Sequence, residues 1–293
     1  MRGARPVDVL IVSLGSTAGL RAADDELQDS LRRAGAKVAV ARALSPAEIP
    51  TLALTDLAWA RAARTAARDM LSQLQRSPPG AIVYSSTTAA LLWPRPGAIR
   101  FDAPSAGNRP GRHGLWQRPL ERRRLREAPL LLPWSEGGLR EAPPSAGGED
   151  RALVLPVPVE PSGPPAPVRD IAAITYAANP AKKGLDRVLA AWGEVRGERG
   201  AAVGELIVAG VCADDLEKAG LAAGGAGVRV VGPLAHEEYR ALLRRSRVFV
   251  CAPRREDYGI AQLEALADGC LLVSTPAPGP YAALPIARAL DRR

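Results

Sequence analysis

Short runs of apolar residues alternate along the chain with longer segments in which apolar residues recur every three or four positions. The short runs predict buried strands, and the longer segments predict amphipathic helices, as in the spacing of Leu27, Leu31 and Ala34. In the first half, strands are expected at residues 7–12, 36–41, 81–84, 98–102, 130–133 and 152–159, and helices at residues 20–34 and 53–75. Apolar strands that alternate with helices predict a parallel sheet covered on both faces.

A proline-rich segment interrupts this alternation. Residues 160–167 hold four prolines, which exclude a helix or a central strand, so a linker is expected at residues 161–169. Beyond it, strands are expected at residues 171–176, 205–209, 228–231, 248–251 and 271–274, and helices at residues 183–195, 236–246 and 260–267. The pattern predicts an α/β protein of two Rossmann-like, doubly wound domains, residues 1–160 and 170–293, that face each other across a cleft.

Length and composition fit this organisation. A chain of 293 residues suits two domains, and 47% hydrophobic with 24% charged residues is typical of a globular protein. No apolar run approaches the ~20 residues that cross a bilayer, and the amino terminus lacks the apolar core of a signal peptide, so a cytoplasmic protein is expected. We expect Cys212, Cys251 and Cys270 to be buried thiols, and neither a disulfide framework nor a zinc site.

The net charge of +8 is compatible with phosphorylated substrates, an anionic membrane surface or nucleic acid. The most basic segment, residues 118–126, predicts a helix that is either a solvated face or a patch for an anionic membrane surface. Aromatic residues make up 4% of the chain and are absent from this segment, so the stacking platforms of nucleic-acid-binding proteins are not evident. No nucleic-acid partner is predicted.

Residues 248–274 carry the strongest candidate chemistry. They predict a strand, a loop, a helix and a strand, with Glu256 in the loop and Glu264 about one turn into the helix. The backbone N–H groups at the start of this helix, near Tyr258 and Gly259, favour an anion such as a diphosphate. A carboxylate accepts two hydroxyl hydrogen bonds at once, so Glu264 suits a ribose diol and Glu256 suits sugar hydroxyls.

Residues 256–264, Glu-Asp-Tyr-Gly-Ile-Ala-Gln-Leu-Glu, resemble the Glu–seven residues–Glu motif of the retaining, GT-B-fold glycosyltransferases of family 4, whose usual form begins Glu-Gly-Phe-Gly. Two upstream stretches extend the resemblance. Residues 176–189, which contain Lys183, are similar to the stretch that opens the family's second domain, and residues 228–234 are similar to the strand and loop over which the nucleotide base lies. The resemblance is specific over roughly residues 170–276 and diffuse over the first 160.

The resemblance implies an enzyme that moves a sugar from a nucleoside diphosphate sugar, UDP- or GDP-linked, to an acceptor hydroxyl of a glycan, lipid or small molecule. It implies retention of configuration and neither a metal nor another cofactor. Glu256 and Lys183 would be catalytic, with Glu256 on the transferred sugar and Lys183 facing the diphosphate, while Glu264 would bind the ribose. The remaining implied donor-binding residues are Tyr258, Gly259, Ile260 and Gly232.

One departure from the family pattern concerns the diphosphate. The family's arginine, five residues before the lysine, falls on Ala178 in this chain. A missing guanidinium removes a bidentate phosphate contact that Lys183 alone does not reproduce. We therefore hypothesise that Lys182, Arg254 or Arg255 supplies the contact, and count all three as donor-binding candidates.

The acceptor side offers fewer signals. The loop with Gly15 and Ser16 follows the first strand and precedes a helix, as the acceptor-side glycine loop does in the family. Asp102 ends a strand, and His113 follows in a turn-rich region, so both are acceptor-side candidates.

Two further function classes are open at this point. A nicotinamide-dependent dehydrogenase would share the Rossmann-like pattern, but the glycine fingerprint after the first strand of either half is absent. A non-catalytic nucleotide-sugar-binding protein of the same fold is the main alternative, because of Ala178. The carboxyl-terminal tail is also short or truncated relative to the family: residues 281–293 remain, which fits a fragment or a minimal form.

Overall fold

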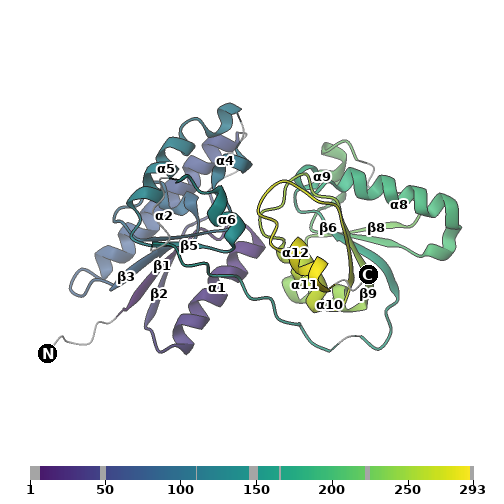
Figure 1. Ribbon diagram of the computed structural model, residues 1–293, viewed down its shortest axis with the longest axis horizontal. Coiled ribbons are helices and arrows are strands. Elements are labelled where there is room, and N and C mark those ends of the chain that lie inside the picture. Colours follow the sequence, from purple (N-terminus) through teal and green to yellow (C-terminus); the bar gives the residue numbers. More distant parts are fainter. Residues whose placement is uncertain are drawn as a thin grey trace. The chain divides into compact units, whose positions relative to one another are not determined.

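The computed structural model describes residues 7–46, 51–109, 111–144, 151–164, 166–221 and 225–290. The chain divides into two compact units, Met1–Pro158 and Val159–Arg293. In Figure 1 the amino-terminal unit runs from purple to teal and the carboxyl-terminal unit from green to yellow, and each contains one sheet flanked by helices.

The amino-terminal unit is built on a five-stranded parallel sheet in the order β2-β1-β3-β4-β5. Its strands are β1 (Val9–Ser13), β2 (Val38–Arg42), β3 (Ala81–Tyr84), β4 (Ala98–Phe101) and β5 (Leu131–Pro133). Its helices are α1 (Ala18–Arg33), α2 (Leu52–Gln73), α3 (Thr87–Ala90), α4 (Ser105–Asn108), η1 (Gly111–Gly114), α5 (Gln117–Glu127) and α6 (Glu136–Glu141). Alternate residues of β1 enter different cores: Leu10 packs on the side of α2 and α5, and Ile11 on the side of α1.

The carboxyl-terminal unit repeats this architecture with the strand order β10-β9-β6-β7-β8, all parallel. The strands are β6 (Ile171–Tyr176), β7 (Leu206–Ala209), β8 (Val228–Gly232), β9 (Ser246–Cys251) and β10 (Leu271–Ser274). The helices are α7 (Pro180–Lys183), α8 (Leu185–Arg199), η4 (Gly200–Val203), α9 (Ala213–Lys218), α10 (His236–Arg245), α11 (Ile260–Ala267) and α12 (Ala283–Leu290). Ile174 packs toward α10 and α11, whereas Ala173 packs toward α8 and α9.

Two parallel sheets with helices on both faces confirm the predicted α/β fold class, but one predicted strand is wrong. Residues 152–159 form a single bridge, between Ala152 and Leu131, and no strand. The segment follows β5 only briefly, with backbone N–H donation from Leu153 to Leu131 and from Leu155 to Pro133. Pro156 and Pro158 have no N–H to donate, so the ladder cannot continue.

The predicted helix 183–195 is interrupted at Gly184. α7 ends at Lys183, Gly184 adopts a left-handed conformation with φ of 63°, and α8 begins at Leu185. A Cβ on residue 184 would lie 1.9 Å from the carbonyl oxygen of Ala252, so a side chain there collides with the chain that follows β9. Glycine allows this close approach.

No helix in the described part of the chain is both long enough and apolar enough to cross a membrane.

Candidate active site

The candidate residues gather where two neighbouring strands end. β6 and β9 are adjacent and parallel, so α7, which follows β6, meets the loop 252–259, which follows β9. The backbone N–H of Arg254 donates to the carbonyl of Lys182 at 2.9 Å and fastens the two segments together. The carboxyl edge of an open parallel sheet is where such folds bind ligands.

Lys183 and Glu256 form an ion pair at this edge. The lysine Nζ lies 2.6 Å from Oε2 of Glu256, and the same oxygen accepts a hydrogen bond from Nε2 of Gln262 at 3.0 Å. Glu256 is 5% exposed and Gln262 1% exposed, so both groups are held inside the loop and α11. The two residues predicted to be catalytic are therefore in direct contact.

A second cluster joins Lys182, Asp257 and Arg255. The lysine Nζ lies 2.7 Å from Oδ2 of Asp257, and Nε of Arg255 donates to Oδ1 at 2.9 Å. Asp257 is 5% exposed, and the Arg255 side chain is 15% exposed. Consecutive lysines of α7 thus pair with consecutive acids of the loop.

Arg254 points to a different partner. Its guanidinium forms two hydrogen bonds with Asp186 of α8, at 2.7 and 2.6 Å, and a third with the carbonyl of Ala181. The arginine hydrogen bonds lower the pKa of Asp186 to about 2. Because both side chains are more than 40% exposed, this is a surface pair.

The start of α11 adjoins these clusters. Gly259, in a left-handed conformation with φ of 92°, is the N-cap of the helix and, as glycine, has no side chain to accept from the first-turn N–H groups, which begin at Ile260. A Cβ on Gly259 would lie 2.8 Å from the Cβ of Ala283. Tyr258 is buried, and its carbonyl accepts from the N–H of Ala283 at 3.0 Å.

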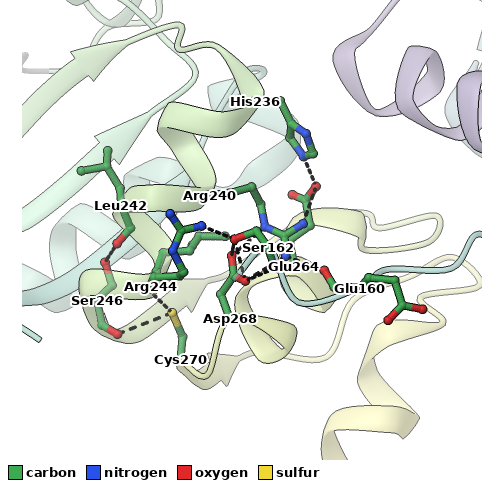
Figure 2. A network of polar contacts seen from close by, with 11 residues as sticks. Glu160, Ser162, His236, Arg240, Leu242, Arg244, Ser246, Glu264, Asp268 and Cys270 are labelled. Atoms are coloured by element: carbon green, nitrogen blue, oxygen red, sulfur yellow. Dashed lines mark hydrogen bonds and ion pairs between the residues drawn. The ribbon is translucent and has the colours of Figure 1, made fainter. Parts of the chain in front are cut away.

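Glu264 lies one turn into α11 and contacts α10 (Figure 2). Its Oε1 is 2.6 Å from Nε2 of His236 and 3.9 Å from a guanidinium nitrogen of Arg240. The hydrogen bond that His236 donates to the Glu264 carboxylate raises the pKa of His236, while partial burial opposes the shift. Glu264 is 7% exposed, whereas the histidine side chain is 55% exposed.

Arg240 connects Glu264 to the segment that enters the unit. Its guanidinium forms two hydrogen bonds with Asp268, at 2.6 and 3.0 Å, and one with the carbonyl of Glu160 at 2.8 Å. Asp268 also accepts from the backbone N–H and the hydroxyl of Ser162, at 2.8 and 2.9 Å, and Figure 2 shows this network beside Glu264. Hydrogen bonds from Arg240 and Ser162 lower the pKa of Asp268 against the effect of burial.

Gly232 ends β8 in a left-handed conformation with φ of 75°. No described atom lies within 4 Å of the position that a Cβ would take, so the backbone there is open to a ligand. Its carbonyl accepts from the N–H of Gly210, which orders the loop after β8.

The acceptor-side candidates lie in the amino-terminal unit. Gly15 and Ser16 follow β1, and the carbonyl of Gly15 accepts from Arg21 at 2.8 Å. Asp102 follows β4 at the same sheet edge and accepts from the N–H of Ala103. His113 lies in η1 and is exposed.

In the described residues, no group of three or more histidine, cysteine, aspartate or glutamate side chains is placed to hold a metal ion. The three cysteines are thiols: Cys251 and Cys270 are buried, and Cys212 is half-buried. That the protein uses neither a metal nor another cofactor stays a prediction.

Four residues at the site go beyond those predicted: Gln262, Asp257, His236 and Arg240. Gln262 and Asp257 lie within residues 256–264, so the motif places them near the site, but it does not predict which residues they contact. His236 and Arg240 lie 28 and 24 positions before Glu264, and no local spacing links them to it.

Comparison with known proteins gives one family match, within the carboxyl-terminal unit. Residues 170–285 match the family model described as glycosyl transferases group 1. A comparison with curated protein sequences gives no match. The matched residues lie within the carboxyl-terminal unit and are similar to a group 1 glycosyltransferase domain, and the predicted enzyme class is confirmed.

Solved structures share the fold over the whole chain. Sucrose-phosphate synthase from Thermosynechococcus elongatus has a TM-score of 0.68 and 14% identity, with 98% of this chain and 89% of that chain covered. WaaG, a glycosyltransferase involved in lipopolysaccharide biosynthesis, has a TM-score of 0.66 and 14% identity, with 97% and 84% covered. HepE from Anabaena, in complex with UDP and glucose, has a TM-score of 0.61 and 12% identity, with 96% and 83% covered. These similarities confirm the predicted GT-B-type fold.

Proposed function

We propose that this chain transfers a sugar from a nucleoside diphosphate sugar to an acceptor hydroxyl, with retention of configuration and without a metal ion. The observation that carries the proposal is the contact between Lys183 and Glu256 beside the start of α11, whose N-cap Gly259 makes no side-chain hydrogen bond, with Glu264 one turn further along the helix. A cation and a helix N-terminus can bind the diphosphate, and a carboxylate can bind the ribose hydroxyls.

In this proposal Glu264 binds the ribose diol through its carboxylate oxygens, and Gly232 leaves room for the base above β8. Lys183 leaves its pair with Glu256 to contact the diphosphate as negative charge develops on the leaving group. Glu256 is then released to accept hydrogen bonds from the transferred sugar. The N–H groups near Tyr258, Gly259 and Ile260 stabilise the same charge through the helix dipole.

With retention, the leaving diphosphate oxygen accepts the proton of the acceptor hydroxyl on the face from which the sugar departs. The residues described above then act by positioning the donor and by stabilising charge. UDP is the first donor nucleotide to test because HepE, a structural neighbour, was crystallised with UDP-glucose. GDP is the second.

The experiment is a thermal-shift panel with UDP, GDP, ADP and dTDP. A nucleotide at 100-fold its Kd adds ~2.7 kcal/mol to the stability of the native state, which gives a readable rise in Tm. Glu264→Gln should bind the active nucleotide about tenfold or more weakly, because a charged acceptor becomes a neutral one. Glu205→Gln, which alters an exposed acid paired with Arg229 in the same unit, is the matched control. No response of the wild type to any nucleotide contradicts the proposal.

A non-catalytic nucleotide-sugar-binding protein is the second candidate. The observation that favours it is Ala178, an exposed residue where the resembled family has an arginine. The two candidates differ in turnover: the transferase releases nucleoside diphosphate from UDP-glucose or another donor over time, and a binding protein does not. Release from the wild type that disappears in Glu264→Gln supports the transferase.

The proposed acceptor site uses the sheet edge of the amino-terminal unit, with Gly15, Ser16 and Asp102, and includes His113 as its outlying member. A peripheral contact with an anionic membrane would use the exposed arginines of α5, while Arg124 is fastened inward by the carbonyl of Leu91. A cytoplasmic location stays a prediction.

A further inference from the structure

We infer that Gln262 is a positioning residue that holds the carboxylate of Glu256 in place when Lys183 turns to the donor diphosphate. The inference rests on the proposed function, in which Lys183 leaves Glu256 as charge develops on the leaving group. It gives a role to a buried amide of α11 that the motif resemblance does not assign.

The contacts of Glu256 distinguish its two carboxylate oxygens. Oε2 receives both donors, Lys183 Nζ at 2.6 Å and Gln262 Nε2 at 3.0 Å. Oε1 receives no hydrogen bond from the part of the chain that the structure describes. The carboxylate is therefore fixed through one oxygen, and the other remains to accept from hydroxyls of the transferred sugar.

The two donors differ in their freedom to leave. Lys183 belongs to α7, reaches Glu256 with a flexible four-carbon side chain and is 21% exposed along that side chain. Gln262 is 1% exposed and lies in the first turn of α11, six positions after Glu256. The lysine can therefore move to a bound anion, whereas the amide of Gln262 stays beside Glu256.

The chemistry of the amide determines which end faces Glu256. A carboxylate that pairs with a lysine accepts hydrogen bonds and donates none, so the NH2 group of Gln262 must face it. The amide oxygen is buried and has no hydrogen-bond partner among the described residues. Because a buried polar atom without a partner costs stability, this arrangement favours the contact with Glu256 over full hydrogen bonding of the amide.

The contact matters at the moment when Lys183 moves. Glu256 is 5% exposed, and a buried carboxylate that has lost its only donor is costly and free to rotate. With Gln262 in place, Oε2 keeps one hydrogen bond and Oε1 keeps its direction. Gln262 thus allows Lys183 to serve the diphosphate without releasing the acid that the proposal assigns to the sugar.

A double-substitution cycle without ligand is the first test, because Lys183→Met reproduces the departure of the lysine. Unfolding temperatures are measured for the wild type, Lys183→Met, Gln262→Met and the double variant. Gln262→Met should lower the unfolding temperature by roughly 3 °C more in the Lys183→Met background than in the wild type, because the buried carboxylate then has no donor. Additive effects overturn the inference.

Turnover is the second test, with the glucose esters of UDP, GDP, ADP and dTDP as donors for the full-length protein. Gln262→Met should lower kcat about tenfold or more and leave the donor KM within about twofold, because the contact is needed only after Lys183 has left. Gln117→Met is the matched control, since Gln117 of α5 is also 1% exposed with an unpartnered amide oxygen. Its kcat should stay within about twofold of the wild-type value.

The outcomes separate the inference from the proposed function. A raised KM with unchanged kcat overturns the inference, because Gln262 would then act only on the bound donor before reaction. An equal loss of kcat in Gln117→Met also overturns it, because the effect would reflect the packing of a buried amide. Coupling in the ligand-free cycle, with no binding of any nucleotide by the wild type, contradicts the proposed function and leaves Gln262 as the second donor to Glu256.

Discussion

His236 places a titratable group 2.6 Å from the carboxylate that the proposal assigns to the ribose. Glu264, and at longer range Asp268, favour the protonated imidazole, whereas Arg240 and partial burial favour the neutral one, and the net effect is a raised pKa. The contact between His236 and Glu264 orients the Glu264 carboxylate before any ligand binds. The histidine side chain is half exposed, so protons exchange readily with solvent.

The pair predicts a pH-dependent contribution to stability. Because the folded-state pKa of His236 is raised, the contribution is fully present below the ordinary histidine value of ~6.5 and is lost as pH rises through the folded-state value. The Tm difference between wild type and His236→Gln should therefore be largest near pH 5.5 and shrink toward pH 8.5. His113→Gln, at an exposed position outside any described ion pair, serves as control. A difference that grows with pH would contradict the assignment.

Gly184 is the residue on which the lysines of α7 depend. We predict that Gly184→Ala destabilises the protein by more than the ~1–2 kcal/mol of left-handed strain, because its Cβ would lie 1.9 Å from a backbone oxygen. Gly220→Ala is the matched control, since Gly220 also has a positive φ, of 71°, where it follows α9, but nothing lies within 4 Å of its Cβ position. Urea unfolding measures both. Equal losses would show that the close approach to Ala252 is unimportant.

At the scale of elements, the segment between β10 and α12 supports the loop that carries Glu256. The N–H of Glu256 donates to the carbonyl of Pro278 at 3.0 Å, and the carbonyl of Glu256 accepts from the N–H of Tyr281 at 3.2 Å. Tyr281 is 2% exposed, and its hydroxyl hydrogen-bonds to that of Ser274. This segment thus holds the loop that carries Glu256 from outside residues 256–264.

We predict that Tyr281→Ala lowers the free energy of unfolding by about 3–5 kcal/mol, the usual effect of removing a buried aromatic ring, and weakens nucleotide binding as well. Tyr281→Phe keeps the ring, loses the contact with Ser274, and should cost about 1 kcal/mol with nucleotide affinity unchanged. Chemical denaturation with a nucleotide titration of each variant measures both effects. Unchanged nucleotide binding by a folded Tyr281→Ala variant would contradict a supporting role of Tyr281 at the nucleotide site.

Local patterns predict the elements with unequal success. The strands 81–84, 171–176 and 271–274 and the helix 260–267 agree with the structure residue for residue, because each is an apolar segment with turn residues or prolines nearby. The prediction of a strand at 152–159 is wrong because it relied on apolar composition and ignored two prolines that have no backbone N–H to donate. The prediction of an unbroken helix over residues 183–195 is wrong because the break at Gly184 depends on the close approach of Ala252, 68 positions away.

The same distinction applies to the site. Lys183 and Glu256 were each predicted as site residues from motif resemblance, and the structure places the two in contact, which the sequence did not predict. The partners of Asp257 depend on β6 and β9 being neighbours in the sheet, which no periodicity in the sequence reveals. His236 likewise reaches Glu264 only through the packing of α10 against α11.

At the scale of the whole molecule, each unit has its own sheet and its own cores on both faces. The residues proposed to bind the donor all belong to the unit that begins at Val159. Four of the five tryptophans, Trp59, Trp93, Trp116 and Trp134, lie in the other unit, and Trp192 lies in α8. Fluorescence can therefore report on the two units separately.

We predict that a bound nucleotide stabilises the unit that contains Trp192 and not the other. At 100-fold the Kd, the wild-type signal should include a transition stabilised by ~2.7 kcal/mol, whereas Trp192→Phe, which reports only the amino-terminal unit, should show no shift. Thermal unfolding followed by tryptophan emission, with and without UDP, is the measurement. The same shift in Trp192→Phe would mean that the two units unfold as one.

The hydrogen bonds of Ser162 give the proline-rich segment an unexpected constraint. By composition this stretch resembles a spacer in which any small polar residue would serve. Yet Ser162 is bonded to Asp268, Asp268 to Arg240, and Arg240 lies against Glu264. Substitution of Ser162 would therefore be tolerated only together with a compensating substitution around Asp268. Shortening or replacing this segment should reduce ligand affinity before it unfolds the protein.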